Sequence, residues 1–261
     1  MTDVAESIRK LWNKCASQYD TGDWQKELFK QAASFIQDSV NNSLLQLPPK
    51  KDGVYLLDYA CGTGKVTMAL KDHITSALGI DISDGMVEIY NTRMSEADVS
   101  NAHAVVGNLL SEQGLTGDID EQARNFDIAF VGFGFHHFED PELTIKRLSS
   151  RLKPGGILAI LDWLPSNEDP QYEAEGGPGH HHHHHHGHGH GHKHGHGSAQ
   201  SSEPQHTIHH DGFSQSMMDK LYSQAGLVDF GFATMEKPLV IEMCGKRVKR
   251  TGFIAKARRS I

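Results

Sequence analysis

The residues best placed to hold a ligand through the backbone stand between Asp58 and Gly64. The apolar run Val54–Asp58 ends in an acid, and Gly62 and Gly64 follow within six residues. Glycine adopts backbone dihedrals that side chains forbid, and it lets a ligand approach the chain closely. The periodic apolar residues after Lys65 predict a helix, whose first N–H groups would point into the same crevice. The spacing therefore predicts a strand, a ligand-binding loop and a helix.

Two common phosphate-binding loops do not fit this spacing. A nucleoside-triphosphate loop requires Gly, four residues and then Gly-Lys-Ser/Thr, but Tyr59 takes the place of the first glycine and Val66 that of the hydroxyl residue. A dinucleotide loop has a third glycine three residues after the second, where this chain has Thr67. What remains is the pattern acid-x-Gly/Ala-x-Gly-x-Gly, formed by Asp58, Ala60, Gly62 and Gly64.

A second acid ends the next apolar run, Ser76–Asp81, which comes one helix after the loop. In a doubly wound sheet the carboxyl end of the second strand lies beside the first loop. A carboxylate there can accept hydrogen bonds from both hydroxyls of a ribose. Asp81 could instead cap the following helix, but Ser83 or Asp84 is better placed to do so. We therefore expect Asp81 to bind a ribose.

These two acids and the loop resemble the first motifs of the class I S-adenosylmethionine (SAM)-dependent methyltransferases. The turn Lys153–Gly156 before the apolar run Ile157–Trp163 is similar to the turn before the fifth strand in that family. The match is to the small-molecule type that includes the ubiquinone and menaquinone biosynthesis methyltransferases. The resemblance implies an α/β fold with a doubly wound, mostly parallel seven-stranded sheet, helices on both faces and an antiparallel C-terminal edge hairpin.

The resemblance also implies the residues that hold SAM, with S-adenosylhomocysteine as the product and no metal required. Family members often place an acid after the third strand to accept from the adenine amino group, and Asn108 stands there with an amide oxygen instead. Leu109 or Leu110 would flank the purine ring. Tyr19, in a Tyr-Asp pair, is either a lid residue near the methionine end or only an anchor of the lid to the core. The implied set is Tyr19, Asp58, Ala60, Gly62, Gly64, Asp81, Ile82, Met86, Asn108, Leu109 and Phe133.

Three histidines are candidates for a catalytic base. Methyl transfer is an in-line displacement that requires positioning and exclusion of water, and sometimes removal of one proton, but no covalent intermediate. His136 and His137 follow the expected fourth strand, and one imidazole could accept a proton from a substrate hydroxyl, amine or thiol. The alternative is that they hydrogen-bond the loop backbone. His210 is the third candidate, and Asp162 at the exit of strand five would line the substrate side.

The chain divides into four segments by pattern. Residues 1–47 form a helical lid, and 48–165 form the SAM-binding core. Residues 166–207 form a disordered insertion, and 208–261 add a helix and strands that complete the same domain. Strand-like patterns at Val228–Met235 and Arg250–Ala257 would form the antiparallel edge.

The composition limits which partners the protein is expected to bind and in which cell compartment it is expected to work. A net charge of −8 over 261 residues argues against nucleic-acid binding, and the basic run 246–250 is better read as edge charges that prevent sheet pairing. Three scattered cysteines indicate neither a disulfide framework nor a zinc site. No membrane-spanning run or signal peptide is present, so we expect a cytoplasmic or nuclear protein. The expected partner is a small-molecule methyl acceptor, with the oligomeric state open.

A histidine tract lies within the insertion and contains twelve of the nineteen histidines of the chain. It has no apolar face to bury, and its imidazoles would bind zinc, nickel or copper loosely. Either it has a role in metal storage or sensing, or it is a tolerated surface expansion. The tract raises one alternative function, a metal-responsive binding protein on a methyltransferase fold. A protein methyltransferase is a separate alternative, which would need an open acceptor groove. The candidate metal ligands are His180, His181, His182, His183, His184, His185, His186, His188, His190, His192, His194 and His196.

Overall fold

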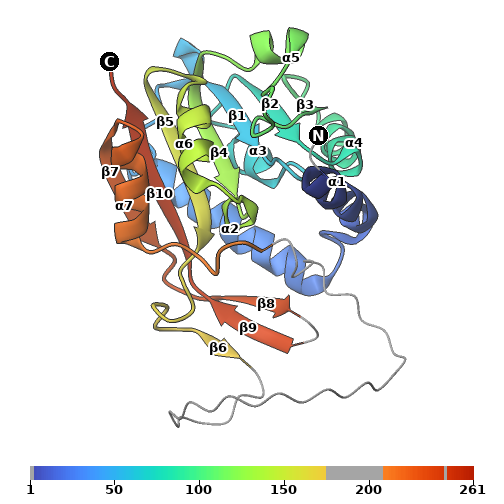
Figure 1. The fold of residues 1–261 in the computed structure, drawn as a ribbon, viewed down its shortest axis with the longest axis vertical. Coiled ribbons are helices and arrows are strands. Elements are labelled where there is room, and N and C mark those ends of the chain that lie inside the picture. Colours follow the sequence, from blue (N-terminus) through green and yellow to red (C-terminus); the bar gives the residue numbers. More distant parts are fainter. Residues whose placement is uncertain (1–2, 175–207, 244–245) are drawn as a thin grey trace.

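The computed structural model describes residues 3–174, 208–243 and 246–261, which fold around one central sheet (Figure 1). Its seven strands lie in the order β3-β2-β1-β4-β5-β10-β7. The neighbouring strands β3, β2, β1, β4 and β5 run parallel to one another, whereas β10 is antiparallel to both β5 and β7. The predicted mostly parallel seven-stranded sheet with an antiparallel edge is therefore confirmed.

The elements alternate along the chain. The helices are α1 (Asp3–Cys15), α2 (Asp23–Asn41), α3 (Lys65–Leu70), α4 (Asp84–Glu96), α5 (Gly117–Gln122), α6 (Pro141–Ser149) and α7 (Gln215–Gln224), with short 3₁₀ turns at Ala16–Gln18, Lys50–Asp52 and Phe135–His137. The strands are β1 (Tyr55–Tyr59), β2 (Ser76–Asp81), β3 (Ala102–Val106), β4 (Phe126–Gly132), β5 (Leu152–Trp163), β6 (Glu173–Ala174), β7 (Leu227–Thr234), β8 (Leu239–Met243), β9 (Lys246–Arg250) and β10 (Gly252–Arg259).

Helices cover both faces of the sheet because successive strand residues point to opposite sides. In β1, Leu56 packs against α2, α3 and α4, while Leu57 packs against the side that carries α5, α6 and α7. In β4, Ile128 lies on the same side of the sheet as Leu56, and Ala129 lies on the same side as Leu57. The inner strands β2, β1, β4 and β5 are thus largely buried on both sides, which explains their nearly continuous apolar sequence, whereas the edge strand β3 exposes His103 and Val106.

Three helices begin at polar residues that cap their first turn. The Ser83 hydroxyl accepts from the N–H of Met86, Asp140 accepts from the N–H of Leu143, and Ser214 caps α7. The helix start at Ser83 is the one expected from the sequence. Because a serine caps α4, the neighbouring Asp81 side chain remains available at the end of β2.

The antiparallel edge differs from a simple hairpin. Between β7 and β10 the chain forms β8 and β9, which pair with β6 as a second sheet in the order β6-β9-β8. This small sheet lies beside α2 (Figure 1), with Leu239 and Ile241 in the same apolar cluster as Ile36 of α2. The prediction that the basic run 246–250 provides edge charges is wrong, because this run is β9, the middle strand of the small sheet, which pairs with both β6 and β8. Its Val248 belongs to the same apolar cluster.

Residues 166–174 correct the expected boundary of the insertion, because they fold onto the protein. Asp169 is buried and accepts hydrogen bonds from the backbone N–H and the hydroxyl of Thr251. Arg250, also buried, donates to the carbonyl of Leu164 and to Asp211, on the far side of the insertion. These hydrogen bonds join residues that lie far apart in the sequence, and the sequence pattern does not predict them. The rest of the insertion, including the candidate metal ligands His180–His196, lies outside the described residues.

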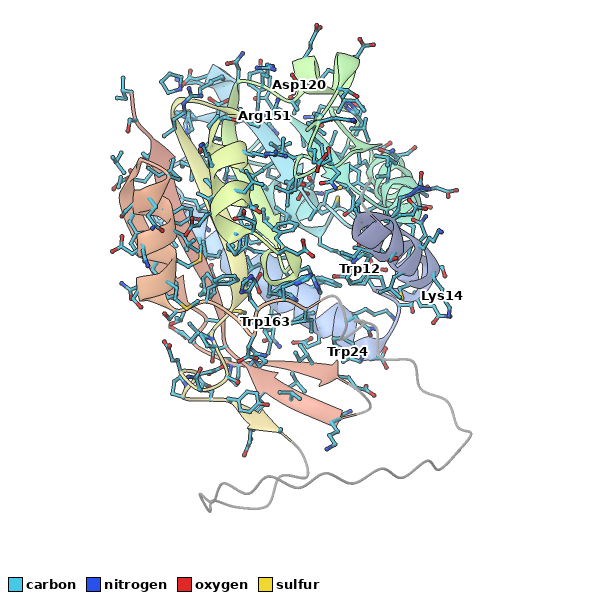
Figure 2. All side chains as sticks on the ribbon, viewed as in Figure 1. Trp12, Lys14, Trp24, Asp120, Arg151 and Trp163 are labelled. Atoms are coloured by element: carbon cyan, nitrogen blue, oxygen red, sulfur yellow. The ribbon has the colours of Figure 1, made fainter. Side chains whose placement is uncertain are left out.

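The two ends of the sheet carry different groups (Figure 2). Asp120 and Arg151 form an ion pair of 2.7 Å at the end where β4 and β5 begin, far from the labelled Trp12 and Trp163. Trp163 closes β5 at the opposite end, where the parallel strands terminate. Over the ranges that the structure describes, no helix is long and apolar enough to cross a membrane.

Replacing Asp169 with alanine should lower the free energy of unfolding by about 2 to 4 kcal/mol, because it leaves the buried N–H of Thr251 without an acceptor. Urea denaturation of the full chain measures the change. Glu168→Ala is the matched control, since Glu168 is an exposed neighbour in the same loop. Equal stabilities for the two variants would show that the Asp169 bonds do not fix this loop.

Candidate functional site

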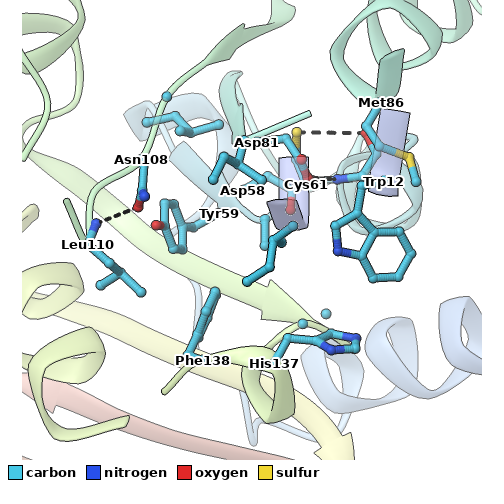
Figure 3. A pocket seen from close by; sticks show the side chains of 18 of the residues that line it. Trp12, Asp58, Tyr59, Cys61, Asp81, Met86, Asn108, Leu110, His137 and Phe138 are labelled. Carbon is cyan, nitrogen blue, oxygen red and sulfur yellow. Dashed lines mark hydrogen bonds between the residues drawn. The ribbon is translucent and has the colours of Figure 1, made fainter. Parts of the chain in front are cut away.

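A cavity of about 460 Å³ lies over the carboxyl ends of β1, β2 and β4. This is the edge at which the strand order reverses, since the chain builds β2 and β3 on one side of β1 and then crosses to β4 on the other. Open α/β sheets bind ligands at such a switch point. Figure 3 shows lining side chains that reach the cavity from the loops after these strands and from the N-terminal helices.

The loop after β1 takes the left-handed backbone conformation three times. Ala60, Gly62 and Gly64 have φ angles of 54°, 49° and 83°. A side chain at position 64 would come within 3 Å of Met94 and Tyr90, so glycine is required there by packing as well as by conformation. Alanine at position 60 tolerates a conformation that costs a non-glycine residue about 1 kcal/mol or more. The loop therefore keeps its turn despite the one Gly-to-Ala departure.

Asp81 closes β2 and points at this loop. Its Oδ2 accepts from the backbone N–H of Gly62 at 2.8 Å, and its Oδ1 accepts from the N–H of Ser83 at 2.9 Å. Burial raises the pKa of Asp81, although the bonds from Ser83 and Gly62 act in the opposite direction. The carboxylate and the glycine loop thus meet at one point of the cavity wall, as the topology predicts.

Asp58 lies below the loop, on the cavity floor. Its Oδ2 accepts from the N–H of Thr67 at 3.2 Å and from the Thr67 hydroxyl at 2.8 Å, whereas its Oδ1 has no hydrogen-bond partner in the described part of the chain. Burial raises the pKa of Asp58 to about 7, despite the bonds from Thr67. An unfolded aspartate titrates near pH ~3.9. Ionisation of Asp58 therefore destabilises the folded protein as the pH rises from about 4 through 7.

The N-terminal helices form one wall of the cavity and are tied to the core by polar contacts. Arg9 donates to Asp84 at 3.0 Å, and Asn13 accepts from the hydroxyl of Ser83 at 2.6 Å. Asp20 bridges the turn after α1 to the glycine loop, with contacts to the Thr63 hydroxyl, to Lys65 and to Arg93. Burial raises the pKa of Asp20, but Lys65 and Arg93 outweigh it and hold this pKa below its usual range.

Aromatic rings line the side of the cavity between this wall and the exit of β4. Trp12 meets Tyr19 edge-on at 5.8 Å between ring centroids and meets His137 at 5.4 Å. Tyr19 in turn contacts Phe29 at 5.7 Å. Figure 3 shows Trp12 and His137 at one end of the cavity, and Asn108 and Leu110 at the other. The cavity thus has an aromatic end and a more polar end.

The two adjacent histidines have different surroundings. His136 is buried, with its Nδ1 2.8 Å from Oδ1 of Asp162 and its backbone N–H donating to Oδ2 of the same carboxylate. Burial raises the pKa of Asp162, but the charge and hydrogen bond of His136 outweigh it, so this pKa lies below its usual range. His137 lines the cavity, with its ring 4.0 Å from that of His136. Only the second histidine of the pair faces the ligand space.

Most of the residues expected to bind the cofactor line the cavity, but two do not. Leu109 is buried in the apolar cluster that also holds residues of α6, and its neighbour Leu110 lines the cavity instead. Gly64 lies behind the loop at the start of α3. Those that line the cavity are Tyr19, Asp58, Ala60, Gly62, Asp81, Ile82, Met86, Asn108 and Phe133.

Two of the three candidate bases lie outside the cavity wall. His136 faces Asp162, and the Nε2 of His210 lies 3.1 Å from the carbonyl oxygen of Phe138. Sequence reasoning missed Trp12, Phe29 and Lys65 as lining residues. Trp12 belongs to an apolar stripe that reads equally well as core packing, so periodicity alone could not separate the two roles.

The model of the methyltransferase-domain family matches residues 25–228. An uncharacterized methyltransferase of Schizosaccharomyces pombe is 32% identical over 120 residues, covering 46% of this chain and 42% of that protein. Demethylmenaquinone methyltransferase of Leptospira interrogans is 29% identical over 164 residues, covering 59% of each. The chain therefore spans only about half the length of these relatives.

A solved structure shares the fold. Phosphoethanolamine N-methyltransferase 2 of Haemonchus contortus, in complex with S-adenosyl-L-methionine, superposes with a TM-score of 0.50 at 12% identity, covering 80% of this chain and 49% of that one. The sheet order, the loop after β1 and the family match agree with one another. On these grounds the chain belongs to the methyltransferase-domain family, with the Rossmann-like fold of the class I enzymes.

Proposed function

We propose that this protein transfers a methyl group from SAM to a small-molecule acceptor held in the cavity. The observation that carries the proposal is the contact between the Asp81 carboxylate and the N–H of Gly62 on the cavity wall. A carboxylate beside a backbone turn of this kind suits a nucleoside, since it accepts from ribose hydroxyls while the loop admits the rest of the ligand closely. Family membership and the SAM bound in the Haemonchus structure support the same ligand.

We assign the lining residues to the parts of SAM in their order along the cavity. Asn108, whose Oδ1 accepts from the N–H of Leu110 at 2.9 Å, would recognise the adenine, with Leu110 against the ring. Asp81 would hold the ribose. The loop at Ala60 and Gly62 would face the methionine portion, and Tyr19 would cover it from the N-terminal wall.

SAM, when bound, supplies an electrophilic methyl group on a sulfonium. The protein would position the acceptor in line with that methyl and exclude water, which the N-terminal wall of the cavity favours. His137 is the one candidate base that lines the cavity, so we assign it the removal of a proton from the acceptor. The buried His136–Asp162 pair would hold the Phe135–His137 turn in place.

The acceptor in the Leptospira relative is demethylmenaquinone, as its name states. A quinol ring is a flat acceptor that an aromatic wall can stack against. The cavity here has such a wall, formed by Trp12, Tyr19 and Phe29. We therefore place phenols and quinols first in a screen with labelled SAM, followed by thiols and amines.

Asp81→Asn should weaken SAM binding at least tenfold. The amide has one acceptor oxygen, so it cannot serve Gly62, Ser83 and two ribose hydroxyls together. Isothermal calorimetry with the full chain measures the dissociation constant, and the exposed Asp118→Asn on α5 is the matched control. Unchanged affinity in Asp81→Asn would remove the ribose role, and absence of binding to the unmodified protein would refute the proposed function.

SAM affinity should increase as the pH rises from about 5.5 to 7.5. SAM carries a net positive charge in this range and favours the ionised form of Asp58, whose pKa near 7 in the unliganded protein means that binding releases a proton. Asp58→Asn should flatten this pH dependence. A calorimetric series over the range, in buffers of different ionisation enthalpy, counts the released protons. If SAM affinity depends on pH equally in the unmodified protein and in Asp58→Asn, the ionisation of Asp58 does not change when SAM binds.

His137→Gln should lower kcat by about 10²- to 10⁴-fold for an acceptor that must lose a proton, with little change in SAM affinity. His103→Gln, at an exposed histidine on β3, is the control. Retention of full kcat by His137→Gln would assign proton removal to another group or to none.

A further inference from the structure

The charges around the cavity are strongly unbalanced. Five carboxyl groups line it, at Asp58, Asp81, Glu112, Glu139 and Asp140, of which Asp58, with its pKa raised by burial to about 7, is only partly ionised at neutral pH. Among the described lining residues, Lys65 is the one lysine or arginine. An anionic ligand would thus meet several like charges and a single ammonium group.

That ammonium group is paired within the protein, with a carboxylate that it shares with Arg93. Lys65 Nζ lies 2.9 Å from Oδ2 of Asp20, whose side chain is only 12% exposed. The same Nζ lies 5.2 Å from the ring centroid of Phe29, which also stabilises a cation. A ligand carboxylate or phosphate would have to share Lys65 with both of these contacts. The cavity therefore has no uncommitted lysine or arginine among its described lining residues.

The apolar part of the wall is dominated by rings. Trp12, Tyr19 and Phe29 come from the N-terminal segment, while Phe133 and Phe138 follow β4. Phe133 is fixed by stacking on Trp163 at 4.4 Å, and Phe138 lies 5.7 Å from Tyr59. Rings on both sides of a cavity favour a flat ligand, and their negative faces favour neutral or cationic groups over anionic ones.

We infer that the methyl acceptor is a neutral or cationic aromatic molecule and that acceptors carrying a carboxylate or phosphate are excluded. This inference rests on the proposed function, because it describes the second ligand of the same cavity. Bound SAM contributes only one net positive charge, which does not offset the carboxylates. Glu112, Glu139 and Asp140 are exposed at the rim of the cavity. Salt therefore weakens the electrostatic repulsion that they exert on an anionic ligand.

Three probes with the same dihydroxyphenyl ring test the inference, namely catechol as the neutral form, dopamine as the cation and protocatechuate as the anion. Their dissociation constants are measured by NMR titration against the full chain, with and without S-adenosylhomocysteine. We expect catechol and dopamine to bind at least tenfold more tightly than protocatechuate at low ionic strength, and the difference to fall in about 0.5 M salt. Protocatechuate binding as tightly as catechol would overturn the inference, as would no binding of any probe.

Two sets of variants separate the charge from the rings. Glu112→Gln combined with Glu139→Gln should reduce the discrimination against protocatechuate about threefold, whereas Glu142→Gln, at an exposed site of α6 outside the cavity, should not. Trp12→Leu should weaken all three probes, with Trp24→Leu, outside the cavity, as its control. A SAM titration of the same preparations tests the proposed function separately, since the probes are also measured without the cofactor product.

Discussion

The hydrogen bond between the Asp81 carboxylate and the N–H of Gly62 is the constraint on which the site depends. It requires that β1 and β2 lie side by side and end at the same level, which their parallel register provides. It also requires a loop that turns sharply enough to point an N–H group back at β2, which the positive φ angles of Ala60, Gly62 and Gly64 allow. The sheet topology and the loop conformation thus bring the Asp81 carboxylate, a hydrogen-bond acceptor, and the backbone of the loop after β1 to the same point of the cavity wall.

The N-terminal helices complete the site without belonging to the sheet. Their contacts fall on the same elements that form the ligand site, because Asn13 binds Ser83 at the start of α4 and Asp20 binds the glycine loop. The Asp20 carboxylate, held by Lys65 and Arg93, ties this wall to the charges beside the loop. The N-terminal wall and the ligand loop are therefore joined through shared residues, although they lie on segments far apart in sequence.

The central part of the fold could be predicted from local signals because each one has a short-range cause. The apolar runs ending in Asp58 and Asp81 and the Gly62–Gly64 loop are all local, and the sheet follows from their order. The turn expected at Lys153–Gly156 is instead the first part of β5, where the register with β4 shifts between Leu152 and Ile157. What the sequence could not show depends on contacts between distant segments. The pairing of Asp169 with Thr251 decides that residues 166–174 fold, and nothing near either residue indicates it. In the same way, burial against Asp162 separates His136 from His137, two identical neighbours in the sequence.

A crystal structure of the protein with S-adenosylhomocysteine tests the central claim most directly. The account predicts the ribose hydroxyls within hydrogen-bonding distance of Asp81, the adenine beside Asn108 and the homocysteine over the loop at Gly62. It also predicts the thioether sulfur directed toward the aromatic end of the cavity at Trp12 and His137. A nucleoside bound elsewhere, or one in this cavity whose ribose does not contact Asp81, would contradict the account.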